Sequence, residues 1–381
     1  MIDRLITPHI ASTKKSVLLL GPRQAGKSTL VSSLQPDLSI NLADEFEFLT
    51  HSSRPEELAR LIEIQKARTV FIDEVQRLPR ILNTVQGLVD KNKALKFYLT
   101  GSSARKLKRG GANLLPGRVL NFKLGPLVAA EASYKLDTSA ALALGTLPEA
   151  YLAKRTREIE HLLRSYAANY LKEEIKAEAL TRNLESFARF LNEAVLSVGQ
   201  FIDLTKVSKK AKISRHSVPR YFEILEDTLI GYRVFPFAKL TEGEDLIRHP
   251  KFFLFDNGVY NGLLQNFVAS ADRVGVLAEQ LVFSQLLHSA WARDLEISIS
   301  SFRTRKGVEV DFITEVGTKI YAVEVKNSDR ISTDDCTGLI FFRKVYPKAS
   351  GLFIFHMGSS EKRLGPVWAL PWQKGLREMG L

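Results

Sequence analysis

Short apolar runs alternate with helix-like stretches over the first third of the chain. Strands that alternate with helices in this way are typical of a parallel sheet. The pattern predicts an α/β domain over residues 1–130. Its expected buried strands are residues 16–20, 38–42, 69–73, 96–100 and 118–122.

Beyond this domain the hydrophobic pattern changes character. Residues 150–195, within an expected domain of residues 131–195, have the pattern of long, charged amphipathic helices. Residues 200–240, within an expected domain of residues 196–270, have the pattern of short helices followed by an extended piece. Residues 271–381 follow the order helix, three strands, helix and strand. The chain is therefore predicted to be an α/β multidomain protein with boundaries near residues 130, 195 and 270.

Composition narrows the class of protein. The chain has 381 residues and a formal net charge of +12, a surplus that attracts polyanions such as nucleic acid. The single cysteine, Cys336, excludes an internal disulfide framework and a cysteine-cluster zinc site. No apolar run approaches the ~18 residues that span a bilayer, and the first residues lack a signal-peptide core. We expect a cytoplasmic protein without a membrane partner.

A phosphate-binding motif follows the first predicted strand. Residues 21–28 match G-x-x-x-x-G-K-[ST] at every fixed position. The glycines let successive N–H groups point at a phosphate, and the helix that follows adds its positive N-terminal end. Lys27 is predicted to reach the β- and γ-phosphates of ATP, and the Ser28 hydroxyl to bind Mg²⁺.

Polar residues end the next two central strands. Asp73 and Glu74 follow a buried strand, where a carboxylate needs a partner. Asp73 is predicted to hold the Mg²⁺ hydration shell, and Glu74 to polarise the attacking water. Ser102 lies where a γ-phosphate sensor is expected, although serine is also common in turns. The expected nucleotide-binding residues are Gly21, Pro22, Arg23, Gln24, Ala25, Gly26, Lys27, Ser28, Thr29, Asp73 and Ser102.

Arg118 precedes the last of these strands, in the sequence Leu-Pro-Gly-Arg. It is a candidate arginine finger that acts in trans across a subunit interface. The alternative is an ordinary surface arginine.

Six motifs resemble those of one family. They are GPRQAGKST, FIDEVQRLP, LTGSSARKL, LPGRVLNFKLGPL, YLKEEI and RFLNEAV. Together they resemble the prokaryotic AAA-type P-loop ATPases that carry a C-terminal domain of unknown function. The resemblance implies an ATP-hydrolysing module, a helical lid over residues 131–195 and a homo-oligomer. Where that family commonly has a double glycine before Phe-Pro, this chain has Gly145-Thr146-Leu147-Pro148.

Residues 198–239 have the pattern of a helix–turn–helix with a following hairpin. Val207 and Ala211 are expected to face inward, and Ser214 to cap the second helix. Such a helix can enter the major groove of duplex or branched DNA while lysines contact phosphates. This winged-helix pattern also resembles the family above, and the alternative role is protein docking. The predicted DNA-binding residues are Lys209, Lys210, Lys212, Arg215, His216 and Arg220.

Strict alternation marks two strands in the last third. In residues 307–313 it places Val308, Val310 and Phe312 on one face. In residues 321–327 it places Tyr321, Val323 and Val325 on one face. The polar faces then carry Asp311, Glu324 and Lys326, a set that can bind Mg²⁺ or Mn²⁺, with Lys326 near the attacking water.

The helix expected over residues 275–290 adds Glu279 within an apolar stripe, where a carboxylate needs a partner. This order of elements resembles the PD-(D/E)xK nuclease core. The resulting metal ligands are Glu279, Asp311 and Glu324, besides Ser28 and Asp73 at the nucleotide. The candidate catalytic residues are Lys27, Glu74, Arg118, Asp311, Glu324 and Lys326.

Two functions remain open from the sequence. The first is an ATP-driven enzyme that binds DNA and cuts it with Mg²⁺. The second is a nucleotide-dependent switch or scaffold, in which an inert nuclease fold acts on a protein partner.

Overall fold

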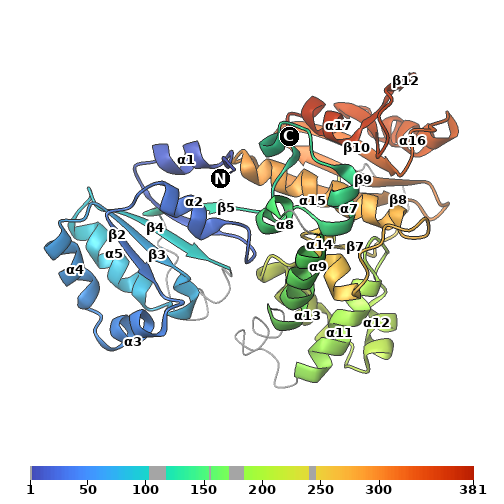
Figure 1. The fold of residues 1–381 in the computed structure, drawn as a ribbon. Coiled ribbons are helices and arrows are strands. Elements are labelled where there is room, and N and C mark those ends of the chain that lie inside the picture. Colours follow the sequence, from blue (N-terminus) through green and yellow to red (C-terminus); the bar gives the residue numbers. More distant parts are fainter. Residues whose placement is uncertain (1, 103–116, 154–155, 171–183, 240–245) are drawn as a thin grey trace. The chain divides into compact units, whose positions relative to one another are not determined.

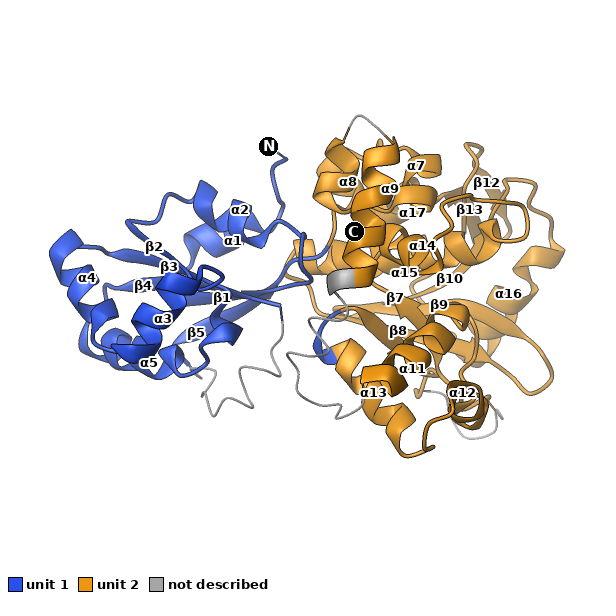
Figure 2. Cartoon of the chain, turned by 60° about the horizontal axis from the view of Figure 1, so that its bottom comes forward, with its two compact units in different colours: residues 1–125, 227–229 blue, residues 126–226, 230–381 orange. Residues whose placement is uncertain are grey.

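The protein forms two compact units (Figures 1 and 2). Its structure, a computed structural model, describes residues 2–102, 117–153, 156–170, 184–239 and 246–381. Unit 1 is residues 1–125 with 227–229, and unit 2 is residues 126–226 with 230–381. The predicted boundaries near 195 and 270 fall inside unit 2. No helix in the described ranges is both long and apolar enough to cross a membrane.

Unit 1 contains a five-stranded parallel sheet of order β2-β3-β4-β1-β5. This confirms the α/β domain and its parallel sheet. The strands are β1 (Ser16–Leu20), β2 (Leu38–Asn41), β3 (Thr69–Asp73), β4 (Lys96–Gly101) and β5 (Val119–Lys123). The helices are α1 (Thr7–Ser12), α2 (Lys27–Ser33), α3 (Glu45–Ser53), α4 (Glu57–Gln65), the 3-10 helix η1 (Val75–Arg77) and α5 (Ile81–Lys91).

Helices cover both faces of this sheet. Leu18 of β1 packs in one hydrophobic cluster with residues of α4 and α5. Val17 and Leu19 pack in another cluster with residues of α1 and α2. Strands buried on both faces read as continuous apolar runs. Because the strands are parallel, the carboxyl ends of β1, β3 and β4 meet at one edge of the sheet.

Unit 2 begins with helices. They are the 3-10 helix η2 (Ala129–Ala132), α7 (Thr138–Leu144), α8 (Pro148–Leu152), α9 (Thr156–Ser165), the π-helix η3 (Tyr166–Tyr170) and α11 (Leu184–Leu196). The predicted long helix is interrupted, because Ala153 after α8 is extended. Most of the YLKEEI motif lies outside the described residues.

The helix–turn–helix pattern corresponds to two short helices and an antiparallel strand pair. These elements are α12 (Leu204–Ala211), α13 (Ser217–Asp227), β6 (Gly231–Val234) and β7 (Lys251–Leu254), followed by α14 (Asn257–Leu264). Val207 and Ala211 are buried as expected. The Ser214 hydroxyl accepts a hydrogen bond from the Ser217 N–H at 3.2 Å, at the start of α13.

The rest of unit 2 is a six-stranded mixed sheet of order β12-β13-β11-β10-β9-β8. Strands β8, β9 and β10 are antiparallel, whereas β10, β11 and β13 are parallel. Its strands are β8 (Ile297–Arg303), β9 (Glu309–Val316), β10 (Lys319–Lys326), β11 (Gly351–His356), β12 (Lys362–Leu364) and β13 (Val367–Pro371). Its helices are α15 (Val274–Ala292), the 3-10 helix η4 (Asp334–Cys336), α16 (Thr337–Val345) and α17 (Trp372–Glu378). The predicted order of elements is therefore present.

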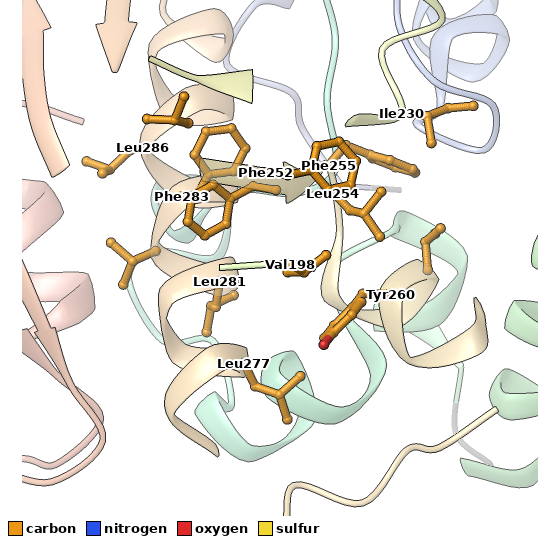
Figure 3. Close-up of a cluster of buried hydrophobic side chains, with 14 of the residues drawn as sticks. Val198, Ile230, Phe252, Leu254, Phe255, Tyr260, Leu277, Leu281, Phe283 and Leu286 are labelled. Atoms are coloured by element: carbon orange, nitrogen blue, oxygen red, sulfur yellow. The ribbon is translucent and has the colours of Figure 1, made fainter. Parts of the chain in front are cut away.

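One hydrophobic cluster joins the parts of unit 2. Figure 3 shows residues of β7 and α15 in this cluster. The ring of Phe253 on β7 stacks on that of Phe283 on α15 at a centroid distance of 4.7 Å, and Phe252 contacts Phe222 of α13 at 5.2 Å. The side chains of Phe252 to Phe255 are fully buried. The strand pair that follows the helix–turn–helix is therefore part of the same core as the C-terminal sheet.

The alternation predicted for β9 is wrong at one position. Val310 packs with Ile313 and Ala322, whereas Phe312 packs in the other cluster with Val323. The two side chains thus lie on opposite faces of the sheet. The β8–β9 register shifts between Ser300 and Phe302, and such an irregularity breaks the two-residue period. On β10, Tyr321, Val323 and Val325 share one cluster as predicted.

The glycine motif after α7 has a structural reason. Asp256, which caps α14, accepts a hydrogen bond from the Thr146 N–H at 2.7 Å and from the Val259 N–H at 3.1 Å. Burial raises the pKa of Asp256 to about 6. Gly145 has φ +73°, and a Cβ there would lie 2.1 Å from Asp256 Oδ1. Glycine is therefore required at 145, while Thr146 is tolerated beside it.

Candidate functional site

The phosphate-binding motif forms a tight loop between β1 and α2. The Gly21 N–H donates to the Gly101 carbonyl at 3.2 Å, which joins the loop to the end of β4. Gln24 and Gly26 have φ of 60° and 89°, so the backbone turns sharply before α2 begins. A Cβ at Gly21 would lie 2.1 Å from the Leu124 carbonyl oxygen. The sequence therefore needs its glycines to form this loop.

Two basic side chains brace the loop from inside. Lys27 is 5% exposed, and its Nζ donates to the carbonyls of Gly21 and Pro22, each at 2.9 Å. The Arg4 guanidinium donates to the carbonyls of Ala25 at 2.6 Å and Gly125 at 2.8 Å. Sequence reasoning missed Arg4, because an arginine before the first helix carries no motif.

Asp73 is the meeting point of three elements at the sheet edge. Its Oδ2 accepts a hydrogen bond from the Ser28 hydroxyl at 2.6 Å. Its Oδ1 accepts from the Thr100 hydroxyl and from the Glu74 N–H, the latter at 3.1 Å. The structure thus brings together Ser28 of α2, Asp73 of β3 and Thr100 of β4. A buried carboxylate with these partners is fully satisfied.

Glu74 is linked to Ser102 through a residue that sequence reasoning missed. The Gln76 amide Nε2 donates to Glu74 Oε2 and to the Ser102 hydroxyl, the latter at 3.1 Å. Gln76 is 6% exposed, and Glu74 has φ 57°, which turns the chain into η1. A carboxylate accepts hydrogen bonds only, so the NH₂ side of Gln76 must face Glu74. Ser103, the next residue of the predicted sensor motif, lies outside the described residues.

Arg118 forms an ion pair within unit 1. Its Nε donates to Asp90 Oδ1, near the end of α5, at 2.8 Å. This hydrogen bond lowers the pKa of Asp90 and raises that of Arg118. The role of Arg118 as a finger toward a second subunit stays a prediction.

The acidic residues predicted in the C-terminal region come together. Asp311 Oδ2 of β9 accepts a hydrogen bond from the Val325 N–H of β10 at 2.9 Å. Lys326 Nζ lies 3.1 Å from Glu324 Oε1 and 3.5 Å from Asp335 Oδ1. Burial raises the pKa of Glu279 and of Glu324, and the charge of Asp311 raises both further. These carboxylates therefore share one partly buried environment.

A second lysine, which sequence reasoning missed, lies among these carboxylates. Lys251 Nζ is 2.8 Å from Glu309 Oε1, 3.2 Å from Asp311 Oδ1 and 3.5 Å from Glu279 Oε2. Burial alone would lower the pKa of Lys251, but the three carboxylates raise it above its ordinary value. The ammonium group is therefore charged.

The predicted metal ligands do not form an open ligand set. Within the described ranges, no group of three or more His, Cys, Asp or Glu side chains is arranged to hold a metal ion. Glu279 and Asp311 surround the Lys251 ammonium, and Glu324 pairs with Lys326. The physical reason is that β7 brings Lys251 to this point, which the sequence pattern of residues 271–381 did not reveal.

The predicted DNA-binding residues lie on the surface of α12, α13 and their connection. Lys210 forms an ion pair with Glu193 at 3.7 Å. The exposed side chains are Lys209, Lys210, Lys212, Arg215, His216 and Arg220. Exposure makes them available to a partner, and their contact with DNA stays a prediction.

Three protein families cover most of the chain. Residues 13–133 match the AAA domain family. Residues 136–270 match a domain of unknown function (DUF8612), and residues 274–374 match another (DUF4143). The AAA match covers most of unit 1 and agrees with the P-loop motifs found in the sequence. The comparisons do not confirm a winged helix or a nuclease fold in unit 2.

The relatives of this chain are uncharacterized proteins, and the similar solved structures are only distantly alike. An uncharacterized protein of Mycobacterium tuberculosis is 24% identical over 329 residues, which are 82% of this chain and 70% of that protein. One of Haemophilus influenzae is 24% identical over 301 residues, 73% of this chain and 70% of that protein. The Saccharomyces cerevisiae Hsp104–ADP complex has 14% identity and a TM-score of 0.30, covering 76% of this chain and 42% of its own. A replication initiator DnaA bound to AMPPCP and single-stranded DNA has 12% identity and a TM-score of 0.26, covering 58% and 85%. TM-scores this low assign neither a fold nor a function to this chain.

Proposed function

We propose that the protein binds and hydrolyses ATP in unit 1. One observation carries the proposal. Side chains from the phosphate-binding loop, β3 and β4 meet at Asp73, in the segment that matches the AAA domain family. The carboxyl edge of a parallel sheet is where nucleotides bind in α/β proteins.

The loop and Lys27 bind the triphosphate. Backbone N–H groups of the loop after Pro22 contact the phosphates, as in other loops of this pattern. Lys27 Nζ, which donates to two loop carbonyls here, then donates to the β- and γ-phosphates. A charged hydrogen bond to phosphate is stronger than one to a neutral carbonyl, so the exchange is favourable.

Ser28 and Asp73, which are hydrogen-bonded to each other, also carry the oxygen atoms that Mg²⁺ prefers as ligands. Mg²⁺ prefers oxygen ligands and keeps several waters, and the Ser28 hydroxyl lies 2.6 Å from the Asp73 carboxylate. We assign Ser28 as a direct ligand and Asp73 as the residue that holds its bound water. When bound, Mg²⁺ supplies positive charge that neutralises the phosphates.

Glu74 and Gln76 direct the attacking water. We assign the water's proton to Glu74 Oε1, because Oε2 accepts from the Gln76 amide. Gln76 holds the carboxylate in place and links it to Ser102, so that the γ-phosphate sensor and the base are coupled. General-base catalysis of this kind contributes about 10²–10⁴-fold to a rate.

Phosphate release from ATP by the purified chain tests this proposal. We expect steady release that stops when a chelator removes Mg²⁺ and resumes when Mg²⁺ is added in excess. Hydrolysis needs the metal charge beside the γ-phosphate. Release that continues undiminished in chelator would contradict the assignment of Ser28 and Asp73.

We also propose that α12 and α13 of unit 2 bind DNA, through the exposed Lys209, Lys210 and Lys212. Two observations support this: the net charge of +12, and the absence of any acid between Leu204 and Phe222. Cleavage of this DNA is not part of the proposal, because Lys251 lies where the catalytic metal of a nuclease would be needed. Unit 2 then acts as the DNA-binding platform, with ATP turnover in unit 1.

The salt dependence of duplex affinity tests this surface. We expect log K to fall linearly with log salt, with a slope of about −0.9 for each phosphate contacted. Replacing Lys209, Lys210 and Lys212 together with alanine should reduce that slope by about two to three. The matched control replaces three exposed lysines elsewhere, Lys306, Lys319 and Lys348, and should leave the slope near wild type. Equal effects of both triple variants would contradict a site on α12.

A further inference from the structure

We propose that Lys251 is a resident cation of unit 2, seated where sequence reasoning places a divalent metal ion. Its ammonium group neutralises the carboxylate cluster of Glu279, Glu309 and Asp311, and it ties β7 to α15 and β9. The inference does not depend on the nucleotide site of unit 1.

The ammonium group uses all of its hydrogen-bonding capacity in this cluster. It carries three N–H donors, and three carboxylate oxygens lie within 3.5 Å, at 2.8, 3.2 and 3.5 Å. Glu309 and Asp311 lie on β9 and Glu279 on α15, whereas the lysine comes from β7. The three carboxylates thus form a cation-binding site, and the cation that fills it is the ammonium group of Lys251.

The backbone that carries Lys251 is fixed. Phe252, the next residue, is fully buried in the main cluster, and its carbonyl accepts a hydrogen bond from the Gly199 N–H at 2.9 Å. On the other side, the Pro250 carbonyl accepts from the Ile202 N–H at 2.8 Å. The Lys251 side chain is 3% exposed. The lysine therefore cannot leave the cluster by moving a surface loop.

The aromatic ring of Phe201 also contacts the Lys251 ammonium. Lys251 Nζ lies 5.4 Å from the centroid of the Phe201 ring, and the Arg303 guanidinium lies 5.2 Å from the same ring. Arg303 also pairs with Glu309 at 3.3 Å. A desolvated cation over a ring face is further stabilised. The cluster is thus closed by cations and an aromatic group, and a divalent ion placed beside Lys251 would be repelled.

Two consequences follow for unit 2. The lysine bonds the strand pair after the helix–turn–helix to the C-terminal sheet, so these parts are held together by charge as well as by the hydrophobic core. Glu279 and Asp311, which resemble ligands of a nuclease metal, instead form ion pairs with the Lys251 ammonium. They therefore do not bind a metal ion in the wild-type chain.

Manganese binding to the full chain, measured by calorimetry without nucleotide, tests the proposal. Lys251→Met keeps the length of the side chain and removes its charge, which leaves the carboxylates without their cation. We expect Lys251→Met to bind Mn²⁺ at least about tenfold more tightly than wild type, since a nearby positive charge is gone. The double variant Lys251→Met with Asp311→Asn should lose this gain. Both parents carry the same nucleotide site, so metal bound there cancels in the comparison.

Two results would overturn the proposal. One is Mn²⁺ binding by Lys251→Met that is no tighter than by wild type. The other is wild-type Mn²⁺ binding that disappears in Asp311→Asn, since it would mean that the cluster takes a metal with Lys251 present. This second comparison needs no change at Lys251, so it decides the question even when Lys251→Met does not fold. Equal Mn²⁺ affinity of wild type and Asp311→Asn would support the proposal.

Discussion

Glu74→Gln is expected to bind ATP with nearly unchanged affinity and to hydrolyse it about 10²–10⁴-fold more slowly. The substitution keeps the size of the side chain and its bond from the Gln76 amide, but the amide cannot take a proton from water. In the proposed site, ATP affinity depends on the loop and Lys27, which the substitution leaves unchanged.

The measurement compares phosphate release with the binding of a fluorescent ATP analogue. Gln76→Ala keeps the Glu74 carboxylate but removes the amide that donates a hydrogen bond to it. Its hydrolysis rate should therefore fall between those of wild type and Glu74→Gln. Glu63→Gln, an exposed acid on α4, serves as the matched control and should retain wild-type turnover. Wild-type turnover by Glu74→Gln would show that the base lies elsewhere.

Lys27→Ala is expected to lose hydrolysis together with tight ATP binding. The variant removes the side chain that we propose contacts the β- and γ-phosphates. Loss of a charged hydrogen bond costs about 1.5–3 kcal/mol, or roughly 10- to 150-fold in affinity. Equilibrium binding of the same ATP analogue measures this directly.

The control for Lys27→Ala is Lys66→Ala, an exposed lysine after α4. It should bind and turn over ATP as wild type does. Thermal unfolding shows that a variant is folded, which separates a lost contact from a collapsed loop. Full turnover by a folded Lys27→Ala would exclude the loop as the nucleotide site.

Much of unit 1 could be predicted because its signals are local. Each buried parallel strand is a continuous apolar run, so β1 and β3 begin and end where the pattern placed them. The loop motif and the acids after β3 lie within a few residues of those strands. The edge at which they meet then follows from the parallel order of the sheet.

Gln76 could not be predicted, because its role depends on backbone geometry. Glu74 has a positive φ, which folds the chain back into η1 and brings the Gln76 amide to the Glu74 carboxylate. Glutamate carries no sequence signal for that conformation. A glutamine two residues after an acid is otherwise unremarkable in a sequence.

Lys251 was missed for a different reason, which is distance along the chain. It lies 60 positions before Asp311, in a segment for which the sequence pattern predicted no functional residue. The C-terminal strands place Asp311, Glu324 and Lys326 correctly together, but nothing in them announces a lysine from β7. The position of Phe312 on the face opposite Val310 was equally hidden, because the alternating sequence does not show that the register shifts between β8 and β9.

The most direct test of the nucleotide site is a single-turnover experiment with radiolabelled ATP and excess protein in Mg²⁺. The account predicts that wild type converts bound ATP to ADP and phosphate, while Glu74→Gln holds its ATP intact over the same time. Equal conversion by both proteins, or no ATP bound by either, would contradict it.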